Sequence, residues 1–251
     1  MTMQLEVCID NLESLHYAQQ GGATRIELCS SLALGGLTPS AGFMQLAAKH
    51  ATIPVYAMIR PRQGDFLFSS DDVEIMLADI HAAKHAQLQG IVVGALTRDG
   101  HVDRDILHAL MKQAGTLGVT FHRAIDQCAD PFAALDTVMQ AGCERVLTSG
   151  LAPSAPEGIT MIKRMVEHCI KHYGDRFSIM PGAGVTADNA ASIIKQTGVN
   201  EIHLSGKSTR PSLMQHIDAS AHMGNANVDD FAIPVTSVEK IKAVVAQIQQ
   251  A

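Results

Sequence analysis

The sequence lacks an excess of basic residues, and this limits the partners it can take. Lysine and arginine number 19 against 25 aspartates and glutamates, which leaves a formal net charge of −6 at pH 7. A protein that binds nucleic acid usually presents a basic face to the phosphates. We therefore expect no nucleic-acid partner.

A long apolar run and a leader-like N-terminus are also lacking. The longest stretch without a charged residue, Leu28 to Ala48, contains Pro39 and three glycines, so it does not resemble a lipid-facing helix. Residues 1–6 show neither the basic segment nor the apolar segment of a secretory signal. We expect no membrane partner.

The five cysteines are an odd number, and none of them belongs to a Cys-x-x-Cys pair. Secreted disulfide frameworks usually use an even number of cysteines, so reduced thiols and a cytoplasmic location are expected. A structural zinc site needs four ligands, which this spacing does not supply.

Strand-like and helix-like segments alternate along the whole chain. Strict alternation predicts parallel strands joined by right-handed crossovers. The 251 residues divided by eight give about 31 per unit, which suits an α/β fold of the (β/α)₈ TIM-barrel type. The eight strand-like runs are Leu5–Ile9, Arg25–Cys29, Val55–Arg60, Gly90–Gly94, Val119–Arg123, Arg145–Thr148, Phe177–Met180 and Glu201–Ser205.

An open doubly wound sheet is the alternative to the barrel. The turn after the first predicted strand, Ile9 to Leu12, has no glycine fingerprint for a dinucleotide, so the barrel is favoured. One domain then spans residues 1–251. Residues 206–234 are rich in Ser, Asn and Asp, and we expect a long irregular loop there, either functional or a surface excursion.

Side chains on a strand alternate between its two faces, and this predicts what lines the barrel. Leu5, Val7 and Ile9 would pack on the helices, so their neighbours would face the axis. The same rule applied to the other polar strands gives an inward set. It consists of Glu6, Cys8, Asp10, Glu27, Cys29, Met58, Arg60, Thr120, His122, Glu201, His203 and Ser205.

Acid–base groups in this set collect toward the C-terminal end, where active sites of this fold lie. Glu27, Arg60 and His122 are the candidate catalytic residues, with Glu6 and His203 beside them. Glu27 or His122 would move a proton, and Arg60 would orient a substrate. The structural alternative is a buried ion network in which Arg60 and a histidine neutralise Glu6 and Glu27.

Two thiols, Cys8 and Cys29, fall at matched heights on adjacent predicted strands, about 4.8 Å apart. Thiolates are soft ligands, and linear Cu(I) coordination needs only two of them. Against this, nearby carboxylates raise the pKa of a thiol, and a buried cysteine often serves as a small hydrophobe. Both interpretations stay open.

Glycine-rich turns follow the last two predicted strands. Barrels often bind phosphate there, through backbone N–H groups and a helix N-terminus. Tight turns without a ligand are the alternative. The residues predicted to bind phosphate or another small anion are Gly182, Gly184, Ser205, Gly206 and Lys207.

Motifs at the ends of most predicted strands closely resemble the copper homeostasis protein CutC family. They are Arg25–Cys29, Gly35–Ser40, Ile59–Phe66, Thr120–Ala124, Leu147–Gly150 and Met180–Val185. The resemblance implies a cytosolic TIM barrel that forms a homodimer or higher homo-oligomer. It also implies a role in copper tolerance, with Cu(I) held by Cys8 and Cys29. Ala183 stands where many members carry glycine, which leaves anion binding open.

Two functions remain open at this point. The first is a copper protein that uses Cys8 and Cys29 as Cu(I) ligands. The second is a barrel enzyme that acts on a small phosphorylated or anionic metabolite, with copper incidental. A binding protein has no need of Glu27, Arg60 and His122 in one cavity, so the residues favour the second and the resemblance favours the first.

Overall fold

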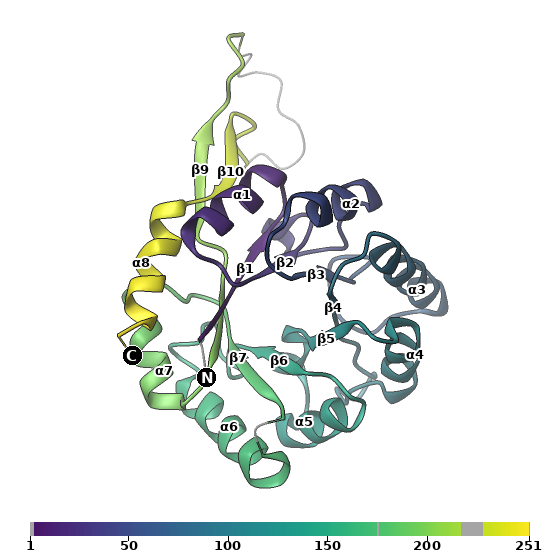
Figure 1. Cartoon of the computed structure of the whole chain (residues 1–251). Helices are drawn as coiled ribbons and strands as arrows, with labels where there is room; N and C mark the ends of the chain where they lie inside the picture. Colours follow the sequence, from purple (N-terminus) through teal and green to yellow (C-terminus); the bar gives the residue numbers. More distant parts are fainter. Residues whose placement is uncertain (1–2, 175, 217–227, 251) are drawn as a thin grey trace.

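A computed structural model describes residues 3–174, 176–216 and 228–250. In this part of the chain, eight parallel strands stand in a ring with helices around the outside (Figure 1). The strands are β1 (Gln4–Ile9), β2 (Arg25–Leu28), β3 (Val55–Met58), β4 (Gly90–Val93), β5 (Gly118–Phe121), β6 (Arg145–Thr148), β7 (Ser178–Pro181) and β8 (Glu201–Leu204).

The strand order is that of a nearly closed barrel. It runs β7-β6-β5-β4-β3-β2-β1-β8, so β1 pairs with both β2 and β8. β7 and β8 lie beside each other at the seam, where the described residues form no backbone ladder between these two strands. The predicted TIM barrel is confirmed, and the predicted strands end at most two residues from the observed ones, as at Met58.

Each strand is followed by a helix that covers the outside of the barrel (Figure 1). Local signals fix the helix starts: Ser69 and Asp72 form a capping box, and α5 begins with Pro131. The helices are α1 (Leu12–Gly21), α2 (Ala41–His50), α3 (Ser70–His85), α4 (Arg104–Ala114), α5 (Pro131–Gln140), α6 (Ile159–Tyr173), α7 (Ala190–Thr197) and α8 (Val238–Ile248), with short 3₁₀ turns at Leu32–Leu34 and Arg123–Gln127.

The main hydrophobic core lies between the strands and the helices. Leu5, Val7 and Ile9 are fully buried in it, as alternation predicts. A separate apolar cluster consists of Tyr56 and Met58 on β3, Val92 on β4 and Cys29 just after β2. The barrel interior also holds buried charged side chains, among them Glu6, Arg25 and Glu201.

Glycines inside the barrel make room for two large rings. A Cβ atom at Gly90 or Gly118 would overlap the side chain of Tyr56. A Cβ atom at Gly94 would overlap the ring of His122. The small residues on β4 and β5 therefore let Tyr56 and His122 lie across the interior of the barrel.

The expected long irregular loop at 206–234 is corrected at its two ends, while residues 217–227 of that segment lie outside the described residues. The segment begins and ends as antiparallel strands, β9 (Lys207–Pro211) and β10 (Ala232–Thr236), which project from the barrel (Figure 1). The sequence conceals them, because β9 is almost wholly polar and the short run of β10 is interrupted by Pro234. The hairpin is tied to α1 by Arg210, which pairs with Glu13 at 2.8 Å.

The described residues include no helix that is both long and apolar enough to cross a membrane.

Candidate site in the barrel

A chain of buried ion pairs forms the lower part of the barrel interior. Arg25 donates to Glu6 and to Glu201, each at 2.5 Å, and Arg145 donates to Glu201 at 3.0 Å. The two arginines also lie over the ring of Tyr56, at 5.5 and 5.1 Å from its centre. Opposite charges thus alternate across the strands and compensate one another in a place that water does not reach.

This network differs from the one considered from the sequence. Arg60 does not neutralise Glu6 or Glu27, because its terminal nitrogens donate instead to backbone carbonyls of nearby loops. Arg25 takes that role. Arg25 precedes Glu27 by two residues on the same strand, so both side chains face inward. The alternation rule therefore indicates Arg25 as well, but the predicted inward set omits it.

Above the ion pairs, Cys8, Glu27 and His203 converge from β1, β2 and β8. The sulfur of Cys8, a carboxylate oxygen of Glu27 and a ring nitrogen of His203 all lie within 4.8 Å of one another, and all three residues are buried. His203 directs Nδ1 at Glu6 Oε1, 2.8 Å away, and places Nε2 3.8 Å from Glu27 Oε2. A carboxylate on one ring nitrogen fixes the orientation in which the other nitrogen can bind a ligand.

The charges in this group are set by their neighbours. Burial alone would raise the pKa of Glu6, but Arg25 and His203 lower it to about 2, so Glu6 is a carboxylate. Burial opposes protonation of His203, yet Cys8, Glu27 and Glu6 raise its pKa well above the usual value. Burial raises the pKa of Glu27 above the ordinary carboxylate value. Of these two carboxyl groups, Glu27 is therefore the one that burial favours in the protonated form.

The two predicted metal-binding cysteines occupy different positions in this arrangement. Cys8 belongs to the converging group. Cys29 belongs to the apolar cluster with Tyr56 and Met58, and its thiol donates to Glu27 Oε2 over 3.4 Å. Burial raises the pKa of Cys8 and, with Glu27, raises that of Cys29 well above its usual value. Both are therefore thiols at neutral pH unless a ligand displaces the proton.

His122 presents an unusual neutral ring to the barrel mouth. Its Nδ1 accepts from the backbone N–H of Ala124 at 3.1 Å, so the proton of the neutral ring lies on Nε2. Burial, together with the positive charge of Arg60, lowers the pKa of His122 to about 3. The ring is consequently an uncharged hydrogen-bond donor at every pH at which proteins ordinarily work.

Three buried polar atoms in the described residues have no hydrogen-bond partner: Glu27 Oε1, Arg60 Nε and His122 Nε2. Such atoms are rare in folded proteins, because each loses its water without a replacement. They belong to the three residues that the sequence predicts to be catalytic. Each of the three atoms is free to form a hydrogen bond that the described residues do not supply.

The glycine-rich turns are only partly at this mouth. Gly182 lies against His203, since a Cβ there would come within 3.3 Å of the histidine ring. Gly184 accepts from Asn189 at the start of α7. Gly206 and Lys207 lead into the hairpin, where Lys207 is exposed and pairs in register with Thr236. Lys207 is thus directed away from the interior, and Ser205 lies at the hairpin base, where its carbonyl accepts from Thr236.

The sequence of this chain matches the CutC family model over residues 3–208. The chain belongs to the CutC family. A CutC family protein of Photobacterium profundum is 75% identical to it over 249 residues, covering 99% of this chain and all of the relative. One of Vibrio parahaemolyticus is 56% identical over 251 residues, covering 99% of this chain and all of that relative.

A solved structure shows the same architecture. The crystal structure of a CutC protein from Streptococcus agalactiae, which carries a provisional assignment to copper homeostasis, superposes with a TM-score of 0.76. It is 33% identical and covers 80% of this chain and 98% of its own. A thiamine phosphate pyrophosphorylase from Pyrococcus furiosus, 14% identical with a TM-score of 0.59 over 99% of this chain and 96% of its own, shares the fold alone.

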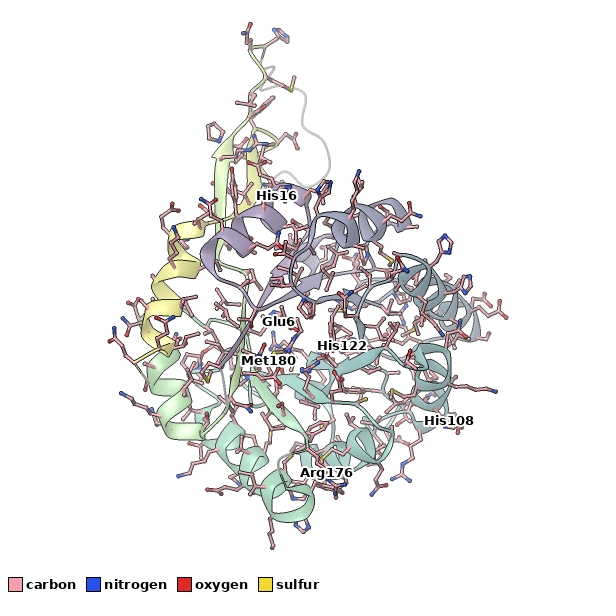
Figure 2. All side chains as sticks on the ribbon, in the orientation of Figure 1. Glu6, His16, His108, His122, Arg176 and Met180 are labelled. Carbon is pink, nitrogen blue, oxygen red and sulfur yellow. The ribbon has the colours of Figure 1, made fainter. Side chains whose placement is uncertain are left out.

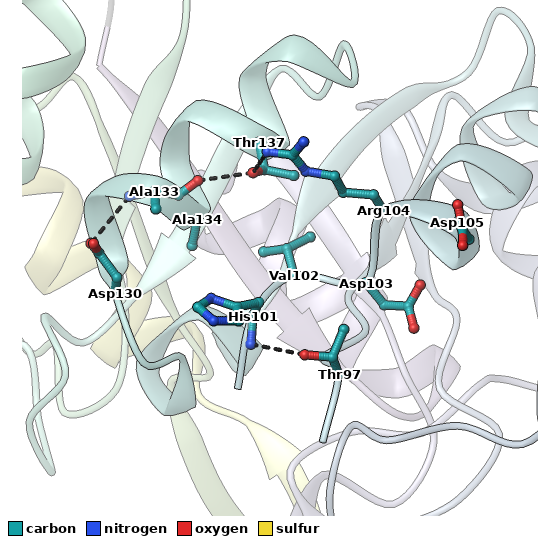
Figure 3. A pocket seen from close by; sticks show the side chains of 10 residues that line it. All are labelled: Thr97, His101, Val102, Asp103, Arg104, Asp105, Asp130, Ala133, Ala134 and Thr137. Carbon is teal, nitrogen blue, oxygen red and sulfur yellow. Dashed lines mark hydrogen bonds between the residues drawn. The ribbon is translucent and has the colours of Figure 1, made fainter. Parts of the chain in front are cut away.

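In this CutC chain the candidate residues lie at the centre of the barrel and not in the outer clefts. Glu6, Met180 and His122 gather inside the ring of strands, whereas His108 and Arg176 lie outside it (Figure 2). A surface cleft of about 630 Å³ lies between α4 and α5, lined in part by Asp103, Arg104 and Asp130 (Figure 3). Of the aspartates that line it, Asp103 and Asp130 cap these helices, so their carboxylates already have partners.

The buried His122 should make the folding of this protein sensitive to mild acid. With a folded pKa of about 3 against an ordinary value of 6.5, the unfolded chain takes up a proton as the pH falls below 6.5 and the folded chain does not. This residue should therefore lower the free energy of unfolding by about 2 kcal/mol between pH 7 and pH 5. Urea unfolding at pH 7 and pH 5 measures this difference in the free energy of unfolding. About 2 kcal/mol of the difference should be missing in His122→Asn and retained in His108→Asn.

A pH dependence that is the same in wild type and His122→Asn would contradict this assignment.

Proposed function

We propose that the protein binds Cu(I) inside the barrel mouth, with the Cys8 sulfur and the His203 Nε2 nitrogen as its two principal ligands. The convergence of these residues with Glu27 within 4.8 Å is the observation that carries the proposal. Membership of the CutC family, one member of which carries a provisional copper homeostasis assignment, supports copper as the metal.

The chemistry of the ligand set fits a soft ion. Thiolate and imidazole both suit copper, and two or three such ligands satisfy Cu(I). Glu6 would hold His203 in place by the 2.8 Å contact to Nδ1. Binding would displace two protons, one from the Cys8 thiol and one from Nε2 of the protonated His203. Glu27, a harder ligand, is suited to take one of them as a carboxylate, and the other passes to solvent. Cys29 would support the site indirectly, because its thiol donates to the Glu27 carboxylate.

An anaerobic Cu(I) competition titration on the reduced protein tests this proposal. We expect one ion per chain, with the affinity lowered about tenfold or more in Cys8→Ser, because one of two ligands is lost. Cys29→Ser should have a smaller effect. Cys143→Ser is the matched control, since Cys143 is also buried but lies beside Met111 and away from the mouth.

Full affinity in Cys8→Ser, or equal losses in Cys8→Ser and Cys143→Ser, would show that the barrel mouth does not hold the ion.

A second function is favoured by the three unpartnered atoms of Glu27, Arg60 and His122. We propose as the alternative an enzyme that acts on a small anionic metabolite, in which Glu27 exchanges a proton and His122 donates a hydrogen bond. Glu27→Gln should then abolish turnover while leaving substrate binding measurable. Intact turnover in Glu27→Gln would rule out its acid–base role.

A further inference from the structure

Arg60 and His122 form a pair of buried donors that the copper proposal does not use. The register of β3, β4 and β5, continued two residues beyond Met58 and one beyond Val93, brings Arg60, Gly94 and His122 to one level. Gly94 has no side chain, so the His122 ring lies across β4 in the space that a Cβ would take. The imidazole is therefore directed from β5 toward the strand that carries Arg60.

One aromatic ring covers both donors. The guanidinium carbon of Arg60 lies 5.1 Å from the centre of the Phe66 ring, and the ring of His122 lies 4.8 Å from the same centre. Phe66 belongs to the segment between β3 and α3, and its carbonyl accepts from the N–H of Leu96. Phe66 thus contacts both side chains, and both are buried.

The pair carries a positive charge that the protein does not balance. Arg60 is only 7% exposed, and no carboxylate of the described residues forms an ion pair with it. Its terminal nitrogens donate to the backbone carbonyls of Leu34, Gly36 and Gly64. These bonds use three of the five N–H donors of the guanidinium. The Nε of Arg60 and the Nε2 of His122 have no partner. A buried guanidinium without a counter-ion is costly unless an anion joins it.

We infer that Arg60 and His122 bind the carboxylate of a small organic acid beneath Phe66. The two unpartnered nitrogens, Arg60 Nε and His122 Nε2, would each donate to one oxygen of a planar carboxylate. The single positive charge of Arg60 balances a carboxylate, whereas a phosphate dianion carries more charge than this pair offsets. The inference rests on the second candidate function and moves its anion from the glycine-rich turns after β7 and β8 to the ends of β3 and β5.

The test is a binding titration of the copper-free protein, which requires no reaction. Sodium acetate is the probe and inorganic phosphate the comparison, both at constant ionic strength. The backbone amide NMR signals of Gly64 and Gly94 report on the two sides of the pair. Acetate should shift both signals saturably, and its dissociation constant should be lower than that of phosphate.

Two variants locate the binding. Arg60→Lys should weaken acetate about tenfold or more, because a hydrogen bond between charged groups is lost. His122→Phe keeps a ring beside Phe66 but removes the donor, and should weaken acetate severalfold even if Arg60→Lys does not fold. Arg62→Lys is the control and should change the affinity less than twofold, since Arg62 pairs with Asp65 and Asp72.

Acetate binding that persists unchanged in Arg60→Lys and His122→Phe would overturn the inference, as would saturable binding of phosphate without acetate or no saturable shift at all. None of these results bears on Cu(I) binding, because the titration omits the metal and the variants leave Cys8 and His203 intact. Turnover is not measured, so a failure of catalysis by Glu27 stays distinguishable from a failure of the carboxylate site.

Discussion

Replacing Arg25 with methionine should lower the free energy of unfolding by about 3–5 kcal/mol, as expected when one partner of a buried ion pair is removed. Arg25 donates to both Glu6 and Glu201, and the three side chains are almost completely buried. Methionine keeps much of the volume but leaves two carboxylates short of one positive charge. Urea unfolding at pH 7 measures the loss directly.

The control for this prediction is Arg210→Met. Arg210 pairs with Glu13 at the base of the hairpin, but both side chains are about one-third exposed. Water and salt screen such a pair, so its loss should cost less than about 1 kcal/mol. A similar loss in the free energy of unfolding for Arg25→Met and Arg210→Met would contradict the prediction, because it would mean that burial does not strengthen the Arg25 ion pairs.

Replacing Gly90 with alanine is expected to cost about 1–3 kcal/mol, the usual penalty for overfilling a packed interior. The added methyl group would overlap the ring of Tyr56. That ring cannot move freely, because its hydroxyl donates to Glu144 at 2.9 Å and Arg25 and Arg145 lie over its face. Thermal unfolding should show a clearly lowered midpoint.

Gly42→Ala is the matched control for the added methyl group. Gly42 lies in α2, and a Cβ there would meet nothing within 4 Å. Alanine is the better helix former, so this variant should be neutral or more stable by up to about 1 kcal/mol. A stabilised Gly90→Ala variant would show that the interior beside Tyr56 is loosely packed.

Much of the fold could be predicted because local patterns and barrel topology agree. Eight apolar runs separated by helical segments predict parallel strands, and inward alternation correctly placed Glu6, Glu27 and His203 inside the barrel. The β9–β10 hairpin could not be found in this way. β9 is almost wholly polar and Pro234 interrupts β10, so neither strand leaves a hydrophobic period in the sequence.

The site could be predicted in its residues but not in its pairings. Alternation indicates that Cys8 and Cys29 both face inward, but not that His203, almost 200 residues later, joins Cys8 and Glu27 in one group while Cys29 stays outside it. That contact depends on the pairing of β1 with β8, a consequence of closing the barrel. Likewise, the partners of Arg60 are backbone carbonyls of loops, which carry no signature in the sequence.

X-ray absorption at the copper edge, on protein loaded anaerobically with one equivalent of Cu(I), would show directly whether the barrel mouth holds the ion. We predict a ligand shell that contains one sulfur and one imidazole nitrogen, from Cys8 and His203. The sulfur should disappear in Cys8→Ser and persist in Cys29→Ser. A ligand shell of two sulfurs without imidazole would contradict binding by Cys8 and His203. A ligand shell that is unchanged in Cys8→Ser would contradict it as well.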